Sequence, residues 1–171
     1  MKNYAGPAEI MYHTGLSADM IRGAKYALVP GDPGRVEGLA KSLDENALFV
    51  ASHRDYTTWL ARVENAPVLV MSTGMGGPCV TFAVEELARL GVETFIRVGT
   101  TGSIQDDLHL GDVVINTASV RMDGASRAYA PIEFPAVADP DTVLALREAA
   151  EESGIPFKTG ISISTDSFWP G

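Results

Sequence analysis

The sequence has a single cysteine, no long apolar run and no excess of basic residues, and each shortage excludes a class of protein. Cys79 is the only cysteine among 171 residues, so no intrachain disulfide can form and the reducing cytoplasm is the simplest location. No apolar run approaches the roughly 20 residues of a membrane-spanning helix. The first residues also lack the basic-then-apolar layout of a signal peptide. We therefore expect a cytoplasmic protein with no membrane partner.

The acidic balance of the chain argues against a nucleic-acid partner. Asp and Glu number 22 against 13 Lys and Arg, which gives a formal net charge of −9. A nucleic-acid binder would show a basic stripe. If the substrate is an anion, local arginines must attract it against the field of the whole protein. Each arginine next to a glycine turn is therefore a candidate ligand.

Several catalytic motifs are also missing. No zinc-ligand spacing, no G-x-S-x-G elbow and no paired-carboxylate motif occurs, so we expect no metal and no resident cofactor. The glycine-rich segment 72–79 lacks the Lys-Ser/Thr of a P-loop, and Cys79 interrupts its match to a dinucleotide loop. Cys79 at a helix start could be an activated thiol. No base is spaced to serve it, so nothing indicates a covalent nucleophile.

Strands and helices are expected to alternate along the chain. Apolar runs bounded by turn residues predict strands at 25–30, 47–54, 56–63, 67–72, 93–98, 112–120 and 157–165. Apolar spacings of three and four predict helices at 35–42, 80–90 and 140–153. This order is typical of an α/β fold with a largely parallel sheet, here in a single domain. Ligands of such sheets bind beyond the carboxyl ends of the strands, which points to the turns after Pro30, Ser72 and Val98.

Two of these turns carry an arginine. In the turn 31–35, Gly31 allows close approach to a ligand and Arg35 could add a forked donor for phosphate; a tight turn with a solvated arginine is the alternative. In the segment 93–98, Arg97 stands in an apolar strand just before two threonines. A buried arginine needs a partner, either a bound anion or a neighbouring acid. We favour the anion for Arg97. From the turn 31–35 alone we favour the solvated arginine for Arg35, because short glycine motifs recur by chance.

Other polar residues indicate little by themselves. His53, Arg54 and Asp55 lie at the junction of two expected strands. His53 and Arg54 could be rim residues or could reach another subunit, and Asp55 could simply neutralise Arg54. His13 and His109 are isolated histidines of the kind that is usually structural. Beyond the last expected strand no further element covers Phe168 and Trp169, so we expect an incomplete C-terminal part of the fold.

Six ordered segments resemble the bacterial uridine phosphorylases of the nucleoside phosphorylase family. They are VPGDPGRVE (29–37), ASHRDYTTW (51–59), STGMGGPCVTFAVEEL (72–87), FIRVGTTGSIQ (95–105), GDVVINTASVRMDGAS (111–126) and EFPAVADP (133–140). The resemblance implies a three-layer α/β sandwich with a mixed, largely parallel central sheet, assembled into a hexamer built of dimers. It also implies reversible phosphorolysis of uridine to uracil and ribose 1-phosphate in pyrimidine salvage, with phosphate as a co-substrate.

The resemblance assigns roles to individual residues. Phosphate ligands are implied at Gly31, Arg35, Arg54, Arg97 and Thr100, with Arg54 donated into a neighbouring subunit. Arg35, Arg97 and Thr100 form the implied catalytic set. His13 and Thr100 are implied ribose contacts, and His13 is implied to reach across from the neighbouring subunit to the 5′-hydroxyl. Thr101, Gly102 and Phe168 are implied to surround the base.

Departures from the family pattern leave alternatives open. Some bacterial members hold a monovalent cation between subunits with a glutamate and a serine, where Asp55 and Cys79 stand here. A shorter carboxylate and a soft sulfur argue against that cation. Trp169 stands where a tyrosine is familiar, and the family's base-reading segment lies beyond Gly171. A purine nucleoside phosphorylase, or an inactive fragment that only assembles or binds phosphate, therefore stays as an alternative. The three arginines argue against a hydrolytic nucleosidase.

Overall fold

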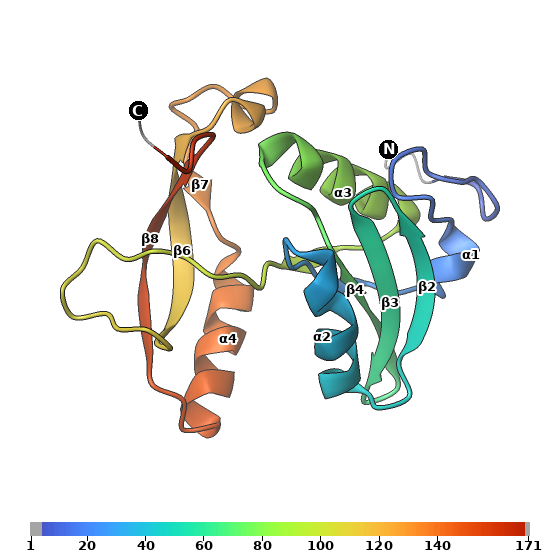
Figure 1. The fold of residues 1–171 in the computed structure, drawn as a ribbon, viewed down its shortest axis with the longest axis horizontal. Helices are drawn as coiled ribbons and strands as arrows, with labels where there is room; N and C mark the ends of the chain where they lie inside the picture. Colours follow the sequence, from blue (N-terminus) through green and yellow to red (C-terminus); the bar gives the residue numbers. More distant parts are fainter. Residues whose placement is uncertain (1–4, 170–171) are drawn as a thin grey trace. The chain divides into compact units, whose positions relative to one another are not determined.

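The computed structural model describes residues 5–169, which form two compact units (Figure 1). The first unit ends at Thr100 and the second begins at Thr101. Each unit has its own β-sheet and its own helices, so the α/β class with mixed sheets is confirmed. The expectation of a single domain over residues 1–171 stays a prediction, and Pro170 and Gly171 lie outside the described residues.

The first unit is built on a five-stranded mixed sheet. Its strand order is β2-β3-β4-β1-β5. β1 pairs in parallel with both β4 and β5, whereas β2, β3 and β4 form an antiparallel meander. The strands are β1 (Tyr26–Leu28), β2 (Leu48–His53), β3 (Tyr56–Val63), β4 (Ala66–Met71) and β5 (Thr94–Ile96).

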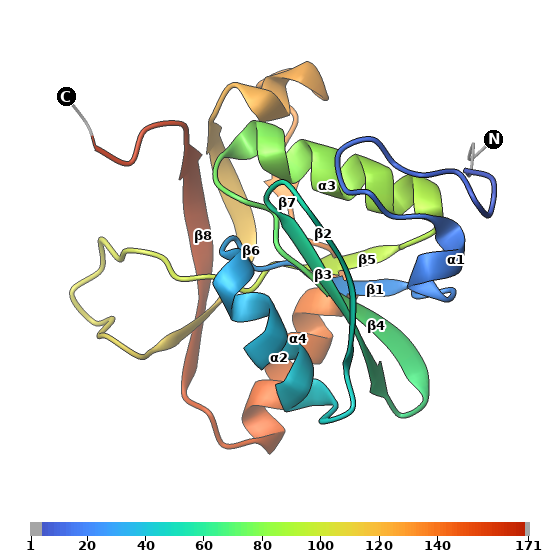
Figure 2. The ribbon, with the colours of Figure 1, turned by 45° about the vertical axis from the view of Figure 1, so that its right-hand side comes forward.

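Two helices cover opposite faces of this sheet, which gives the first unit three layers (Figure 2). Helix α3 (Gly77–Leu90) has a proline in its first turn and ends at Gly91, whose φ of +106° suits a glycine. Helix α2 (Val36–Leu43) follows the short 3₁₀ helix η1 (Pro33–Arg35). The short α1 (Ala18–Ile21), which the sequence pattern did not predict, lies in the N-terminal segment.

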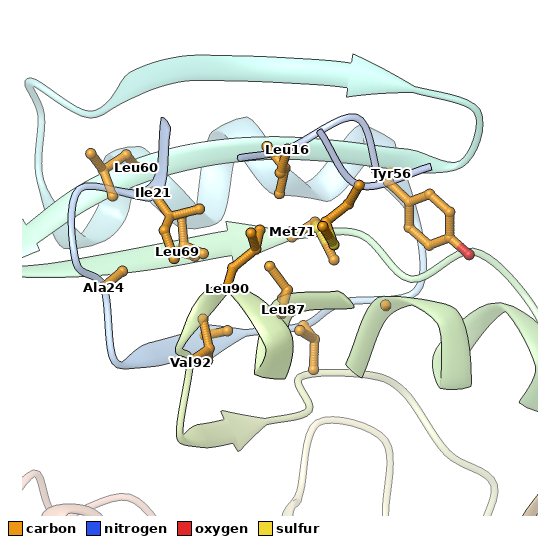
Figure 3. Packing of buried hydrophobic residues seen from close by; sticks show 14 residues of the cluster. Leu16, Ile21, Ala24, Tyr56, Leu60, Leu69, Met71, Leu87, Leu90 and Val92 are labelled. Carbon is orange, nitrogen blue, oxygen red and sulfur yellow. The ribbon is translucent and has the colours of Figure 1, made fainter. Parts of the chain in front are cut away.

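The core follows the alternation of side chains along β4. Leu69 and Met71 point to the face covered by α3, where they pack with Leu87 (Figure 3). Val70 points to the other face and packs with Val36 of α2. All five side chains are fully buried, so substitution of any of them by alanine would leave a cavity. This rigid core fixes the ends of the parallel strands.

The second unit is a smaller three-stranded sheet with one crossover helix. Its strand order is β7-β6-β8, and helix α4 (Pro140–Glu152) joins the parallel strands β6 (Val113–Met122) and β8 (Phe157–Thr165). The two-residue β7 (Ala136–Val137) adds an antiparallel edge. Asp139 caps α4 by accepting from the Thr142 N–H at 2.8 Å.

The predicted elements are present with small shifts at their ends. β3 and β8 have the predicted bounds, whereas β5 is shorter than the predicted 93–98. β7 and the short 3₁₀ helix η2 (Ala125–Ala128) were not predicted. Within residues 5–169, no helix is long and apolar enough to cross a membrane.

Candidate active site

Three turns lie together at one edge of the first sheet. Strands β4, β1 and β5 are parallel neighbours, so their carboxyl ends share this edge. The Thr73 N–H donates to the carbonyl of Pro30 at 2.8 Å, and the Gly74 N–H donates to the carbonyl of Gly31 at 2.9 Å. The turn after β4 is thereby fixed to the turn after β1, at the place where α/β sheets bind ligands.

Arg97 follows β5 directly, and its guanidinium lies over Gly31. A Cβ atom on Gly31 would come within 3.6 Å of Nη2 and 3.8 Å of Nη1 of Arg97. Nη1 also donates to Oγ1 of Thr73 in a long hydrogen bond of 3.5 Å. Arg97 therefore joins the ends of all three strands in one cluster.

The expectation that Arg97 lies inside an apolar strand is wrong. β5 ends at Ile96 because its partner β1 ends opposite it at Leu28, and Arg97 is exposed. The alternative of an acid paired with Arg97 finds no support either, since no carboxylate of residues 5–169 lies within ion-pair distance of it. Four of the five guanidinium N–H donors thus have no partner in this part of the chain, and a ligand could accept from them.

Arg35 closes the turn that follows β1. The side chain of Asp32 accepts from the Gly34 N–H at 2.8 Å and caps η1, as expected for an aspartate before a proline. That N–H is therefore already bonded within the turn. Arg35 is exposed, and no carboxylate of the described chain is paired with it. The Gly34 N–H is therefore not a free donor, and the candidate anion ligands of this turn are Gly31 and Arg35.

A second cluster surrounds His13. Its Nδ1 lies 2.6 Å from Oε1 of Glu86 in α3. Its ring stacks on Phe82, with centroids 4.1 Å apart and planes 4° from parallel. Tyr12 meets the same ring edge-on at 5.0 Å. The ring nitrogen of His53 is 2.8 Å from the carbonyl of His13 and ties this segment to the end of β2.

Arg54 belongs to this second cluster and not to that of Arg97. Arg54 and Asp55 form the two-residue loop of the β2–β3 hairpin, and the φ of Arg54 is +55°. A non-glycine residue adopts this left-handed backbone at a cost of roughly 1 kcal/mol. The guanidinium carbon of Arg54 lies 5.4 Å from the ring centre of Tyr12, a cation–π distance. Tyr12 therefore links Arg54 to His13, the two residues expected to act in trans.

Two buried groups near these clusters have shifted pKa values. Burial of the Glu86 carboxyl would raise its pKa, but hydrogen bonds from the backbone N–H groups of His13 and Thr14 and from the His13 ring outweigh burial and hold the pKa below its ordinary value. Burial, with the nearby negative charges of Cys79 and Asp55, raises the pKa of Tyr56 to about 12. The Tyr56 hydroxyl donates to the carbonyl of Cys79 at 3.0 Å, so it serves as a neutral donor at physiological pH.

The residues expected around the base belong mainly to the second unit. Thr101 and Gly102 are exposed, and the Thr101 hydroxyl donates to the Gly102 carbonyl at 3.2 Å. Phe168 is 86% exposed and meets Trp169 edge-on at 5.2 Å. Thr100, the last residue of the first unit, is also exposed.

Sequence reasoning missed the partners that hold the expected site residues. Glu86 was not singled out, although a carboxylate among the buried Ala83, Leu87 and Leu90 of α3 is a signal that could have found it. Thr73 was noted only as part of a glycine turn. Among residues 5–169, no group of three or more His, Cys, Asp and Glu side chains is arranged to hold a metal ion.

Comparisons with known proteins agree with this architecture. The family model of the Phosphorylase superfamily matches residues 25–171. A uridine phosphorylase of Escherichia coli (strain K12) is 52% identical over 161 residues, which are 94% of this chain and 63% of that protein. A uridine phosphorylase of Thermococcus kodakarensis is 49% identical over 148 residues, 86% of this chain and 53% of its own length. A guanosine phosphorylase of Halorubrum lacusprofundi is 41% identical over 145 residues, 85% of this chain and 60% of its own.

The chain thus spans less than two thirds of the length of these relatives. The family match nevertheless includes Arg35, Arg54 and Arg97 and all the parallel strands of the two sheets. The resemblance read from six short segments is confirmed, and the chain belongs to the phosphorylase superfamily as a homologue of uridine phosphorylases.

Proposed function

We propose that the protein carrying this chain catalyses the reversible phosphorolysis of uridine. A phosphate oxygen attacks the anomeric carbon, the glycosidic bond breaks, and uracil leaves with the bonding electrons and takes up a proton. Ribose 1-phosphate is the other product. The observation that carries the proposal is the Arg97 guanidinium over Gly31, without a carboxylate partner among the described residues, in a chain 52% identical to a uridine phosphorylase.

The proposed phosphate site combines Gly31, Arg35, Arg97 and Thr100 of one subunit with Arg54 of a neighbour. Fixed cations at the phosphate would offset the acidic field of the protein and stabilise charge as it develops in the transition state. The left-handed backbone of Arg54 supports its part in this set, because strained non-glycine residues concentrate at functional sites. Sharing of the site between subunits fits a hexamer built of dimers.

The sugar and base sites complete the proposal. His13 and Thr100 would contact the ribose, and Phe168, Thr101 and Gly102 would surround the pyrimidine. The cytoplasm is the location that we propose. A purine substrate is the second candidate, supported by the 41% identity to a guanosine phosphorylase.

Arg97→Ala in the complete gene product tests the phosphate site. Loss of one oriented cationic donor should lower kcat/KM for phosphorolysis by roughly 100- to 1,000-fold with the fold intact. Arg62→Ala is the matched control, because Arg62 is an exposed arginine whose Nη1 bonds the Asn65 carbonyl at the opposite edge of the sheet. An Arg97→Ala enzyme that keeps most of its rate would refute the assignment.

Mixed oligomers test the trans role of Arg54. Inactive Arg54→Ala and inactive Arg97→Ala subunits, unfolded together and reassembled, should recover part of the activity, because some sites would then contain both arginines. No recovery in demonstrably mixed assemblies would contradict donation of Arg54 between subunits.

A further inference from the structure

Glu86 is a buried acid whose hydrogen bonds within the described residues all come from one short segment. It lies on the inner face of α3 and is 8% exposed. Oε1 accepts from the backbone N–H of His13 at 2.9 Å and lies 2.6 Å from its Nδ1, while Oε2 accepts from the Thr14 N–H at 2.8 Å. A buried carboxylate is tolerated only with such partners. These bonds fasten a loop to a helix more than 70 residues away along the chain.

The same contacts fix the tautomer of the neutral imidazole ring. A carboxylate can only accept, so the bond at Nδ1 places a proton there and leaves Nε2 of the neutral ring as an acceptor. Phe82 stacked on the ring and Tyr12 at its edge restrict its rotation. The His13 side chain remains 30% exposed, and no residue of the described chain is hydrogen-bonded to Nε2.

We propose that Glu86 is a positioning residue, which holds His13 in the Nδ1–H form so that Nε2 accepts a hydrogen bond from the 5′-hydroxyl of the nucleoside. This inference rests on the proposed function, in which His13 contacts the ribose. It adds a discrimination that the arginines do not provide: the protein would favour substrates with a free 5′-hydroxyl donor over those that lack it. An unpaired Nε2 beside a 5′-deoxy sugar loses that bond.

A purely structural role for Glu86 makes a different prediction. If Glu86 only anchors residues 13 and 14 to α3, its loss would lower kcat/KM by the same factor for every substrate. If it acts through Nε2, its loss matters only where a 5′-hydroxyl is present. Uridine and 5′-deoxyuridine differ in this single group and so separate the two roles.

The experiment compares Glu86→Gln with wild type in the complete gene product on both substrates with inorganic phosphate. A bound hydroxyl that is left without its partner costs about 1–3 kcal/mol, so kcat/KM for uridine should fall roughly 5- to 150-fold. The fall for 5′-deoxyuridine should stay below about threefold, because the bond to Nε2 is already absent there. In a His13→Ala background, Glu86→Gln should have no further effect on uridine.

Glu85→Gln is the matched control, since it removes the same charge from the exposed neighbouring position of α3 and should change neither rate. If Glu86→Gln lowers kcat/KM by the same factor for uridine and 5′-deoxyuridine, the inference is overturned. Absence of uridine cleavage by wild type would instead overturn the proposed function. If Glu86→Gln does not fold, Glu86→Asp replaces it, because its charge is kept while its carboxylate falls one methylene short of Nδ1. The same substrate-selective loss is then expected, and equal losses again refute the inference.

Discussion

Gly74→Ala should destabilise the first unit through the turn that joins β4 to the Arg97 cluster. The φ of Gly74 is +70°, which costs an alanine roughly 1–2 kcal/mol. Its new Cβ would also lie 2.9 Å from Cβ and 3.3 Å from Cγ of Asp55. Asp55 cannot withdraw freely, because its carbonyl accepts from the Ser72 hydroxyl at 2.6 Å. With about 1–3 kcal/mol for overpacking, the free energy of unfolding should fall by about 2–5 kcal/mol in total.

Urea unfolding of Gly74→Ala beside Gly38→Ala checks this reasoning. Gly38 lies in α2, and a Cβ there meets nothing within 4 Å, so alanine should stabilise the protein by about 0.5–1 kcal/mol. The two substitutions add the same methyl group, but the free energy of unfolding is expected to fall for Gly74→Ala and to rise for Gly38→Ala. A free energy of unfolding of Gly74→Ala within about 0.5 kcal/mol of the wild-type value would refute the argument, since surface substitutions already change it by that much.

Two other substitutions test buried polar contacts. Tyr56→Phe removes the hydrogen bond to the Cys79 carbonyl and should cost about 1 kcal/mol at pH 7. Because the folded pKa of Tyr56 is raised to about 12, wild type should lose stability as the pH rises from 10 towards 12, and the variant should lack that part of the slope in thermal melts. Arg121→Met removes five hydrogen bonds that hold the loop after β6, so limited proteolysis should cut that loop faster; the exposed Arg127→Met should not.

Local signals were enough to predict most of the architecture. The apolar run 157–165 has no competing helical pattern, and β8 has those bounds. Asp32 before Pro33 caps η1, and Gly91 ends α3, through backbone chemistry that needs no tertiary information. The rule that ligands bind beyond parallel strand ends points to the turns after Pro30, Ser72 and Val98, and the first two of these turns are hydrogen-bonded to each other.

The remaining features depend on contacts between distant segments. β5 stops at Ile96 because β1 offers no further partner, and this pairing is invisible in the segment 93–98 itself. The bonds from Glu86 to His13 and Thr14 join residues more than 70 positions apart, which no spacing rule covers. Tyr12 became relevant only when the fold brought its ring to both Arg54 and His13.

Short elements were missed for an energetic reason. The four residues of α1 and the two of β7 are too short to show a periodic pattern, and tertiary packing stabilises such pieces more than their own propensity does. Ile21 at the end of α1 is buried in the main core, which is a contact that the sequence pattern alone does not reveal.

Cleavage of uridine by the purified complete gene product, with and without phosphate and with inosine alongside, tests the central claim most directly. We predict release of uracil and ribose 1-phosphate only when phosphate is present, and slower cleavage of inosine. Faster cleavage of inosine would favour a purine nucleoside phosphorylase, and cleavage without phosphate would indicate a hydrolase. A folded sample that cleaves neither nucleoside with phosphate present would contradict the proposed phosphorolysis.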